Sequence, residues 1–155
     1  MIILVINCGS SSIKYQLLDM KNDDVYSLLA KGIVEKIGLE CGRLQHTPAG
    51  KEKVVKDLPV PDHTVGMQIV LDALIDKDHG VLKSFDDIEA VGHRIVQGAD
   101  FFSGSAIVDE DVIKKIDFCC DFAPLHNPAH LLGIRACQEV LPSVPQVVTF
   151  DTAFH

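Results

Sequence analysis

The alternation of apolar and polar positions at the start of the chain predicts a β-hairpin. Residues 2–8 are rich in β-branched side chains, which favours a buried strand, and residues 12–18 predict a second strand after a Gly-Ser turn. Because side chains alternate with a period of two, one face of the first strand carries Ile3, Val5 and Asn7. Cys8 belongs to the opposite, apolar row, which favours a packed thiol over a nucleophile.

The middle of the chain predicts further strands and one helix. Strands are expected between residues 24 and 58, with a turn in "TPAGKEK". A helix is expected after Pro61, with Asp62 as its N-cap, because apolar residues recur at helical spacing from Met67 to Ile75. The stretch "IEAVGHRIV" then predicts another strand.

The last third predicts two more helices and a final strand. One helix is expected from Asp109 or Glu110, and another from Asn127-Pro128, since proline suits the first helical position. The expected buried side of this last helix consists of Ala129, Leu132, Ala136 and Val140. The segment "PQVVTFD" predicts a short buried strand that ends in a carboxylate. Strands followed by a mixture of helices and strands predict one α/β layer structure.

Composition narrows the class of protein. The 155 residues are 47% hydrophobic and 23% charged, which is typical of a globular domain. The net charge of -8, with acids and bases mixed along the chain, argues against a nucleic-acid or anionic-membrane partner. Neither a membrane span nor a secretory segment is expected. Five cysteines without framework spacing favour a reducing compartment, so a cytoplasmic location is expected.

The segment "NCGSSSIK", residues 7–14, is the first candidate site. A glycine, successive turn N–H groups and the hydroxyls of Ser10, Ser11 and Ser12 can wrap an anion such as phosphate. Ser12 and Lys14 lie two residues apart in the second strand and therefore share a face. The alternative is an ordinary hairpin turn with a solvated lysine, because such short motifs are weakly specific, and the segment is not a Walker loop.

The segment "GHRIVQGAD", residues 92–100, is the second candidate. Alternation puts Arg94 and Val96 on one face and His93 and Ile95 on the other. A guanidinium beside an isopropyl group can hold a carboxylate and pack its short alkyl tail. A surface ion pair of Arg94 is the alternative.

Two further polar residues stand next to predicted elements. His126 in "APLHNPAH" directly precedes a helix start, where free N–H groups attract anions, and a neutral imidazole there can donate to a phosphoryl oxygen. A metal shared with His130 is not expected, since His130 falls inside the first turn. Asp151 ends a buried strand, where open α/β sheets place their ligand sites. His126 could equally have a structural role, and Asp151 could instead cap the next secondary-structure element.

Four ordered segments resemble the acetate and propionate kinase family: "VINCGSSSIK", "VGHRIVQGA", "APLHNP" and "FDTAFH". The resemblance implies an actin-like fold of the sugar-kinase and Hsp70 type, with a mixed β-sheet and flanking helices. It also implies that residues 1–155 form the N-terminal domain of a two-domain enzyme, whose C-terminal nucleotide-binding domain is absent from this chain.

The same resemblance implies roles for individual residues. Asn7 would lie near a Mg²⁺ ion, and the phosphate side of the ATP site would be lined by Ser10, Ser12 and Lys14. Arg94 would hold the substrate carboxylate, between pocket walls formed by Val96 and Leu125. His126 would stabilise the transferred phosphoryl group, and Asp151 would be an essential acidic group.

The reaction that this resemblance implies is transfer of the γ-phosphoryl group of ATP to acetate, giving acetyl phosphate and ADP, by a homodimeric enzyme. The 155-residue chain alone is expected to be inactive. Two alternatives remain open at this point. One is a propionate or butyrate kinase, and the other is a non-catalytic anion-binding module.

Overall fold

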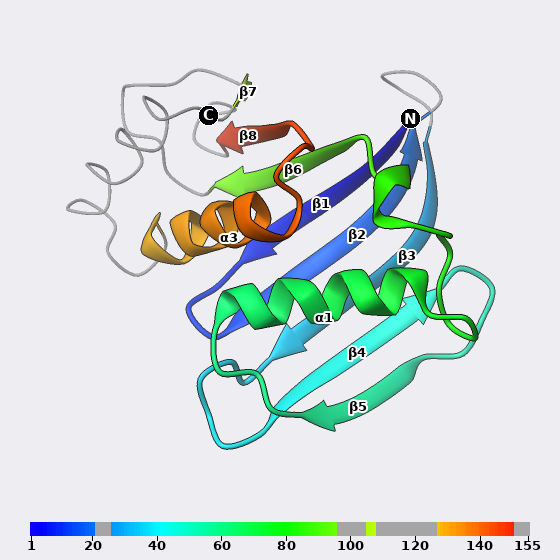
Figure 1. The fold of residues 1–155 in the computed structure, drawn as a ribbon, viewed down its shortest axis with the longest axis vertical. Coiled ribbons are helices and arrows are strands. Elements are labelled where there is room, and N and C mark those ends of the chain that lie inside the picture. The colour runs from blue at the N-terminus through cyan, green and yellow to red at the C-terminus, as the bar shows by residue number, and fades with distance from the viewer. Residues whose placement is uncertain (21–25, 96–104, 108–126, 151–155) are drawn as a thin grey trace.

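The structure is a computed structural model that describes residues 1–20, 26–95, 105–107 and 127–150. Within these ranges the chain forms an eight-stranded mixed sheet with strand order β5-β4-β3-β2-β1-β6-β8-β7 (Figure 1). The strands are β1 (Ile2–Cys8), β2 (Ser12–Met20), β3 (Tyr26–Glu35), β4 (Gly42–Pro48), β5 (Val54–Leu58), β6 (Ala90–Ile95), β7 (Ser105–Ile107) and β8 (Gln146–Phe150). The α/β class expected from the sequence is confirmed.

β1 lies between an antiparallel half and a largely parallel half of the sheet. It pairs with β2 in the predicted hairpin, with Asn7 opposite Lys14. On its other edge it runs parallel to β6, with Val5 opposite Gly92, and β6 in turn runs parallel to β8. The carboxyl ends of β1, β6 and β8 therefore lie at the same edge of the sheet, which is where α/β sheets bind ligands.

Two α-helices, α1 (His63–Ile75) and α3 (Asn127–Val140), lie side by side on one face of the sheet (Figure 1). Helix α1 begins where the sequence predicts. The Asp62 side chain accepts a hydrogen bond from the Val65 N–H at 2.9 Å, which satisfies one unpaired donor of the first turn. A short 3-10 helix, η1 (Phe85–Asp87), leads into β6.

The core lies between these helices and the sheet. Alternate residues of the strands face the helices, among them Leu4, Ile6, Cys8, Ile13, Tyr15 and Leu17, and they meet Met67, Val70, Leu71 and Leu74 of α1. One prediction for α3 is wrong, because Leu132 is 50% exposed. The buried side of α3 consists of Gly133, Ile134, Ala136 and Cys137. Gly133 lies against the Cys8 side chain.

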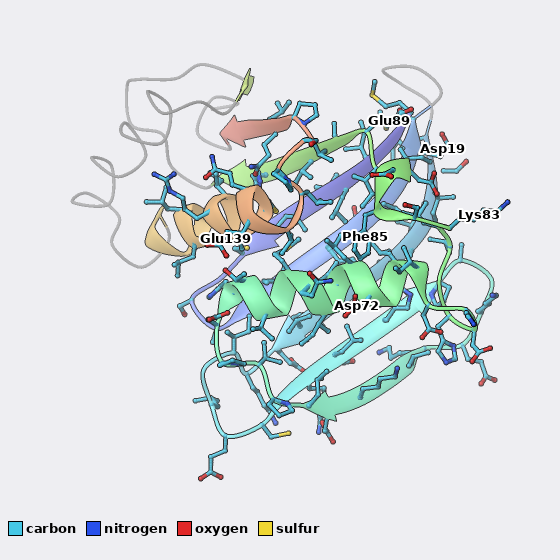
Figure 2. The ribbon with its side chains drawn as sticks, viewed as in Figure 1. Asp19, Asp72, Lys83, Phe85, Glu89 and Glu139 are labelled. Atoms are coloured by element: carbon cyan, nitrogen blue, oxygen red, sulfur yellow. The ribbon has the colours of Figure 1, made fainter. Side chains whose placement is uncertain are left out.

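The start of β1 is fixed by polar contacts. The Met1 amine lies 3.4 Å from Asp19 Oδ1, and the Ile2 N–H donates to Glu89 Oε2 at 3.2 Å. Figure 2 shows Asp19 and Glu89 near this end of the strand. These contacts link the start of β1 to β2 and to the residue that precedes β6.

Several predictions lie outside the described residues. They are the helix expected from Asp109 or Glu110 and the candidate residues Val96, Leu125, His126 and Asp151. Two described elements adjoin them in sequence, since α3 begins one residue after His126 and β8 ends one residue before Asp151. In the part of the chain that is described, no helix is long and apolar enough to cross a membrane.

Candidate active site

Asn7 and Lys14 stand side by side on the face of the sheet opposite the helices. They are directly paired across β1 and β2, and both side chains are exposed. Their strand neighbours Cys8 and Ile13 are buried under the helices, so alternation directs Asn7 and Lys14 to the other face. The amide and the ammonium predicted to handle an anion are thus brought together.

Three carbonyl groups of the turn between β1 and β2 accept hydrogen bonds from within the protein. The Gly9 N–H donates to the Ser12 carbonyl at 2.9 Å, and the Ile37 N–H donates to the Ser11 carbonyl at 2.9 Å. The Gly9 carbonyl accepts from His63 Nε2, also at 2.9 Å. Ser10 and Ser11 are exposed. The turn therefore directs bound carbonyls inward and presents two hydroxyl-bearing residues to solvent.

Gly9 lies close to the side chain of Ser12. A Cβ at this position would lie 2.8 Å from Ser12 Oγ, so a larger residue would displace that hydroxyl. Ser12 and Lys14 lie two residues apart in β2, as predicted, but the Ser12 hydroxyl packs against Gly9. Within the turn, Ser10 and Ser11 are the more accessible hydroxyls.

A hollow of about 400 Å³ extends from Asn7 and Lys14 across the open face of the sheet. Its lining is mainly polar side chains from β1 to β4, with a lysine from the following turn: Asn7, Lys14, Gln16, Lys31, Gln45, Thr47 and Lys53, together with Val5, Tyr15, Gly32 and Ile33. Lys53 Nζ lies 3.3 Å from Gln45 Oε1, and Gln45 donates to Glu35 at 2.8 Å. Three ammonium groups give this hollow a local positive charge in an acidic protein, which suits an anionic ligand.

Arg94 lies near the end of β6, and its backbone is opposite Thr149 of β8. The parallel register pairs Ile6 with His93, so position 94 is level with Asn7 on the neighbouring strand. His93 is buried and hydrogen-bonds to Gln146 on the helix side of the sheet. By alternation, position 94 belongs to the opposite row, which contains Gly92 and Asn7.

Cys8 is confirmed as a packed thiol. Burial raises its pKa to about 12, so the thiolate is not formed at neutral pH. Burial, and secondarily the nearby Cys8, also raise the pKa of Cys137. Among the described residues, Cys8, Cys41 and Cys137 are free thiols, and no group of three His, Cys, Asp or Glu side chains could hold a metal.

Two buried histidines were not singled out from the sequence. His46 Nε2 faces the His79 carbonyl at 3.0 Å, and its Nδ1 lies 2.6 Å from the Tyr15 hydroxyl. Since a carbonyl only accepts, Nε2 carries the proton and Nδ1 accepts from Tyr15. Burial lowers the pKa of His46, an effect partly opposed by the His79 carbonyl, and burial raises the pKa of Tyr15.

The second of these histidines, His63, is the first residue of α1 and contacts the turn at Gly9. The sequence offered only its place directly after the N-cap Asp62 as a signal. Its partner lies 54 positions away in the chain, however, and no local pattern identifies such a contact.

A glycine-serine turn at the carboxyl edge of an α/β sheet, beside a lysine-lined hollow on its open face, is suited to a domain that binds anionic ligands, as phosphotransferases do. The chain matches the sequence profile of the acetokinase family over residues 2–155, and it belongs to that family.

Individual relatives agree with this assignment. A protein of Alkaliphilus metalliredigens named acetate kinase is 54% identical over 153 residues, which are 99% of this chain and 38% of the relative. The crystal structure of Porphyromonas gingivalis acetate kinase matches with a TM-score of 0.94 and 46% identity, over 99% of this chain and 38% of that one. A propionate kinase from Francisella tularensis matches over the same shares, with a TM-score of 0.86 and 39% identity. The actin-like fold that the sequence resemblance implied is confirmed, and the chain spans about 38% of the length of these relatives.

Proposed function

We propose that this chain is the N-terminal domain of an enzyme that transfers the γ-phosphoryl group of ATP to acetate. The observation that carries the proposal is the Gly9–Ser12 turn, whose carbonyls are bound inward, beside the paired Asn7 and Lys14. Family membership over residues 2–155 supports it. A C-terminal domain that holds most of the nucleotide is part of the same proposal.

The chemistry of acetate explains why cationic and hydrogen-bonding groups dominate this site. A carboxylic acid has a pKa of about 4, so acetate is already ionised at neutral pH and needs no general base. The barrier comes from bringing two anions together in line, which is overcome by positioning and by electrostatic stabilisation. Lys14, with Ser10 and Ser12, would hold phosphate oxygens.

The remaining roles follow the family resemblance. Arg94 would hold the acetate carboxylate, with Val96 and Leu125 as walls around its methyl group. His126 would donate to the transferred phosphoryl group. Because no proton has to be removed from acetate, Asp151 would orient groups or ordered water instead of acting as a base.

A Mg²⁺ ion fits the residues present in one specific way. Asn7 offers an exposed amide oxygen, and Mg²⁺ commonly retains water ligands while it takes one or two oxygens from protein and others from nucleotide phosphates. Asn7 would therefore contact the ion or one of its waters. When bound, the ion would neutralise charge on the phosphate groups. Lys14, directly opposite Asn7, would bind a phosphate oxygen next to it.

The test joins the full chain to the C-terminal part of the Porphyromonas gingivalis acetate kinase, in place of that enzyme's own N-terminal segment. Acetyl phosphate formed from ATP and acetate is trapped with hydroxylamine and compared with the intact enzyme and with the unjoined 155-residue chain. We expect turnover from the fusion and none from the chain alone. A folded fusion without turnover would refute the proposed function and leave the non-catalytic anion-binding alternative.

Arg94→Ala in this fusion is expected to reduce turnover by roughly 10³- to 10⁵-fold, by analogy with arginines in other phosphoryl transfers. Arg135→Ala on α3, a residue exposed to solvent, is the matched control and should retain turnover. Equal turnover of the two variants would remove the role assigned to Arg94.

Propionate is the second candidate substrate, because the Francisella tularensis propionate kinase shares the fold. Acetate is favoured, since the relatives named acetate kinase include proteins of higher identity. One methylene changes selectivity by only about 1–3 kcal/mol in an apolar pocket, so the fusion should be assayed with acetate, propionate and butyrate in parallel.

The cellular location, oligomeric state and partners of the enzyme belong to the same proposal. Free thiols at Cys8, Cys41 and Cys137 support a reducing compartment, and so a cytoplasmic location. Assembly as a homodimer rests on the family resemblance. The acidic net charge supports small anions, and not nucleic acid or a membrane surface, as the partners.

A further inference from the structure

The Gly9–Ser12 turn combines carbonyls that are bound with N–H groups that are not. The carbonyls of Gly9, Ser11 and Ser12 each accept a hydrogen bond from within the protein. By contrast, no hydrogen bond among the described residues uses the N–H or hydroxyl groups of Ser10 and Ser11. A phosphate at the N–H groups of Ser10 and Ser11 would therefore meet free donors, provided that the Gly9–Ser10 peptide keeps its orientation.

This peptide is the part of the turn that can rotate most easily. Glycine tolerates most backbone conformations, so the Gly9–Ser10 peptide plane can flip at little steric cost. A flip would turn the Gly9 carbonyl toward the ligand side and the Ser10 N–H away from it. An anion would then face a carbonyl oxygen, which repels it.

One side chain opposes that flip. His63 Nε2 lies 2.9 Å from the Gly9 carbonyl oxygen, and because a carbonyl only accepts, Nε2 must carry the proton. His63 is buried at the first position of α1, and the Asp62 cap fixes the start of that helix. The donor is thus held by a rigid element that packs against the sheet.

We propose that His63 is a positioning residue of the phosphate-binding turn. Its Nε2–H holds the Gly9 carbonyl turned inward, so that the N–H groups of Ser10 and Ser11 face the bound phosphate. The inference rests on the proposed function for the identity of the ligand as a nucleotide phosphate. The geometry of the turn itself predicts binding of an oxyanion whether or not the chain supports phosphoryl transfer.

The first experiment uses the full 155-residue chain and inorganic phosphate. Amide NMR shifts of Ser10 and Ser11 are followed as phosphate is added to the wild-type chain, to His63→Ala and to His63→Gln. Loss of one hydrogen bond should weaken phosphate binding by about 2- to 12-fold in His63→Ala. His63→Gln, which retains an N–H donor, should bind within twofold of wild type.

Gln68→Ala is the control on the same helix, since Gln68 bonds only to the exposed Asp72 among the described residues, and it should bind phosphate like wild type. Equal weakening in His63→Ala and His63→Gln, or wild-type binding in both, would overturn the proposal. So would phosphate that leaves the Ser10 and Ser11 amides of the wild-type chain unshifted.

Imidazole ¹⁵N shifts of the wild-type chain give a test without any substitution. A neutral His63 protonated at Nδ1 instead of Nε2 would also overturn the proposal, even if a variant failed to fold.

The fusion with the Porphyromonas gingivalis C-terminal part separates this inference from the proposed function. There His63→Ala should raise the KM for ATP more than it lowers kcat, with His63→Gln close to wild type. If the fusion lacks turnover but phosphate binding to the chain depends on the donor at position 63, the function fails and the positioning role stands. If the fusion turns over and neither His63 variant changes KM, only the positioning role fails.

Discussion

Replacing Tyr15 with Phe removes one hydroxyl from the core and leaves the ring in place. The hydroxyl lies 2.6 Å from His46 Nδ1, and the two residues are only 2% and 1% exposed. Because His46 Nε2 already donates to the His79 carbonyl, Nδ1 would become a buried acceptor without a donor. An unpaired buried group costs about 1–3 kcal/mol, so the free energy of unfolding should fall by that amount.

Urea unfolding of the chain at pH 8, followed by far-UV circular dichroism, measures this loss. With an m-value of about 2 kcal/mol/M, the midpoint should fall by about 0.5–1.5 M without a change in slope. Tyr26→Phe is the matched control, because Tyr26 is 59% exposed, and it should change the free energy of unfolding by less than about 0.5 kcal/mol. Equal midpoints for the two variants would show that the Tyr15 hydroxyl does not satisfy His46.

Three further outcomes are expected in unfolding experiments. Burial lowers the pKa of His46 below 6.5, so on acidification the unfolded chain binds more protons than the native chain. The free energy of unfolding should therefore fall from pH 7 to 5. If His46→Gln shows the same pH dependence, another group causes the effect. Leu71→Ala should cost about 2–5 kcal/mol because it opens a cavity under α1, whereas Leu132→Ala on the exposed side of α3 should cost little. In Gly133→Ala the new Cβ would clash with Cys8 Sγ, so the free energy of unfolding should fall by about 1–3 kcal/mol. The double variant with Cys8→Ala should lose less stability than the sum of the two single variants. Strictly additive losses would exclude the clash.

Local sequence signals predicted most of the described elements. Alternation identified the β1–β2 hairpin and the row that contains Asn7, since one face of each strand is buried. The N-cap Asp62 and the proline at position 128 marked two helix starts correctly. The direct pairing of Asn7 with Lys14 was not predicted, because alternation assigns faces and does not fix the register between strands.

Long-range contacts could not be predicted in this way. The partners of His63 and His46 lie 54 and 31 positions away, and neither contact has a local pattern. Leu132 was wrongly predicted to lie on the buried side of α3, because a pattern search at helical spacing favours large apolar residues over glycine. In the structure, the small Gly133 allows α3 to approach Cys8 closely, and Leu132 lies on the exposed side.

The position of β1 in the middle of the sheet has a consequence for local opening. Its backbone amides are shielded by β2 on one edge and β6 on the other, so their hydrogens should exchange with solvent only when a large part of the domain opens. The Gly9–Ser12 turn is joined directly to this central strand. Fraying at the outer strands β5 and β7 should therefore leave the turn intact, and an anion bound there should find its site already formed.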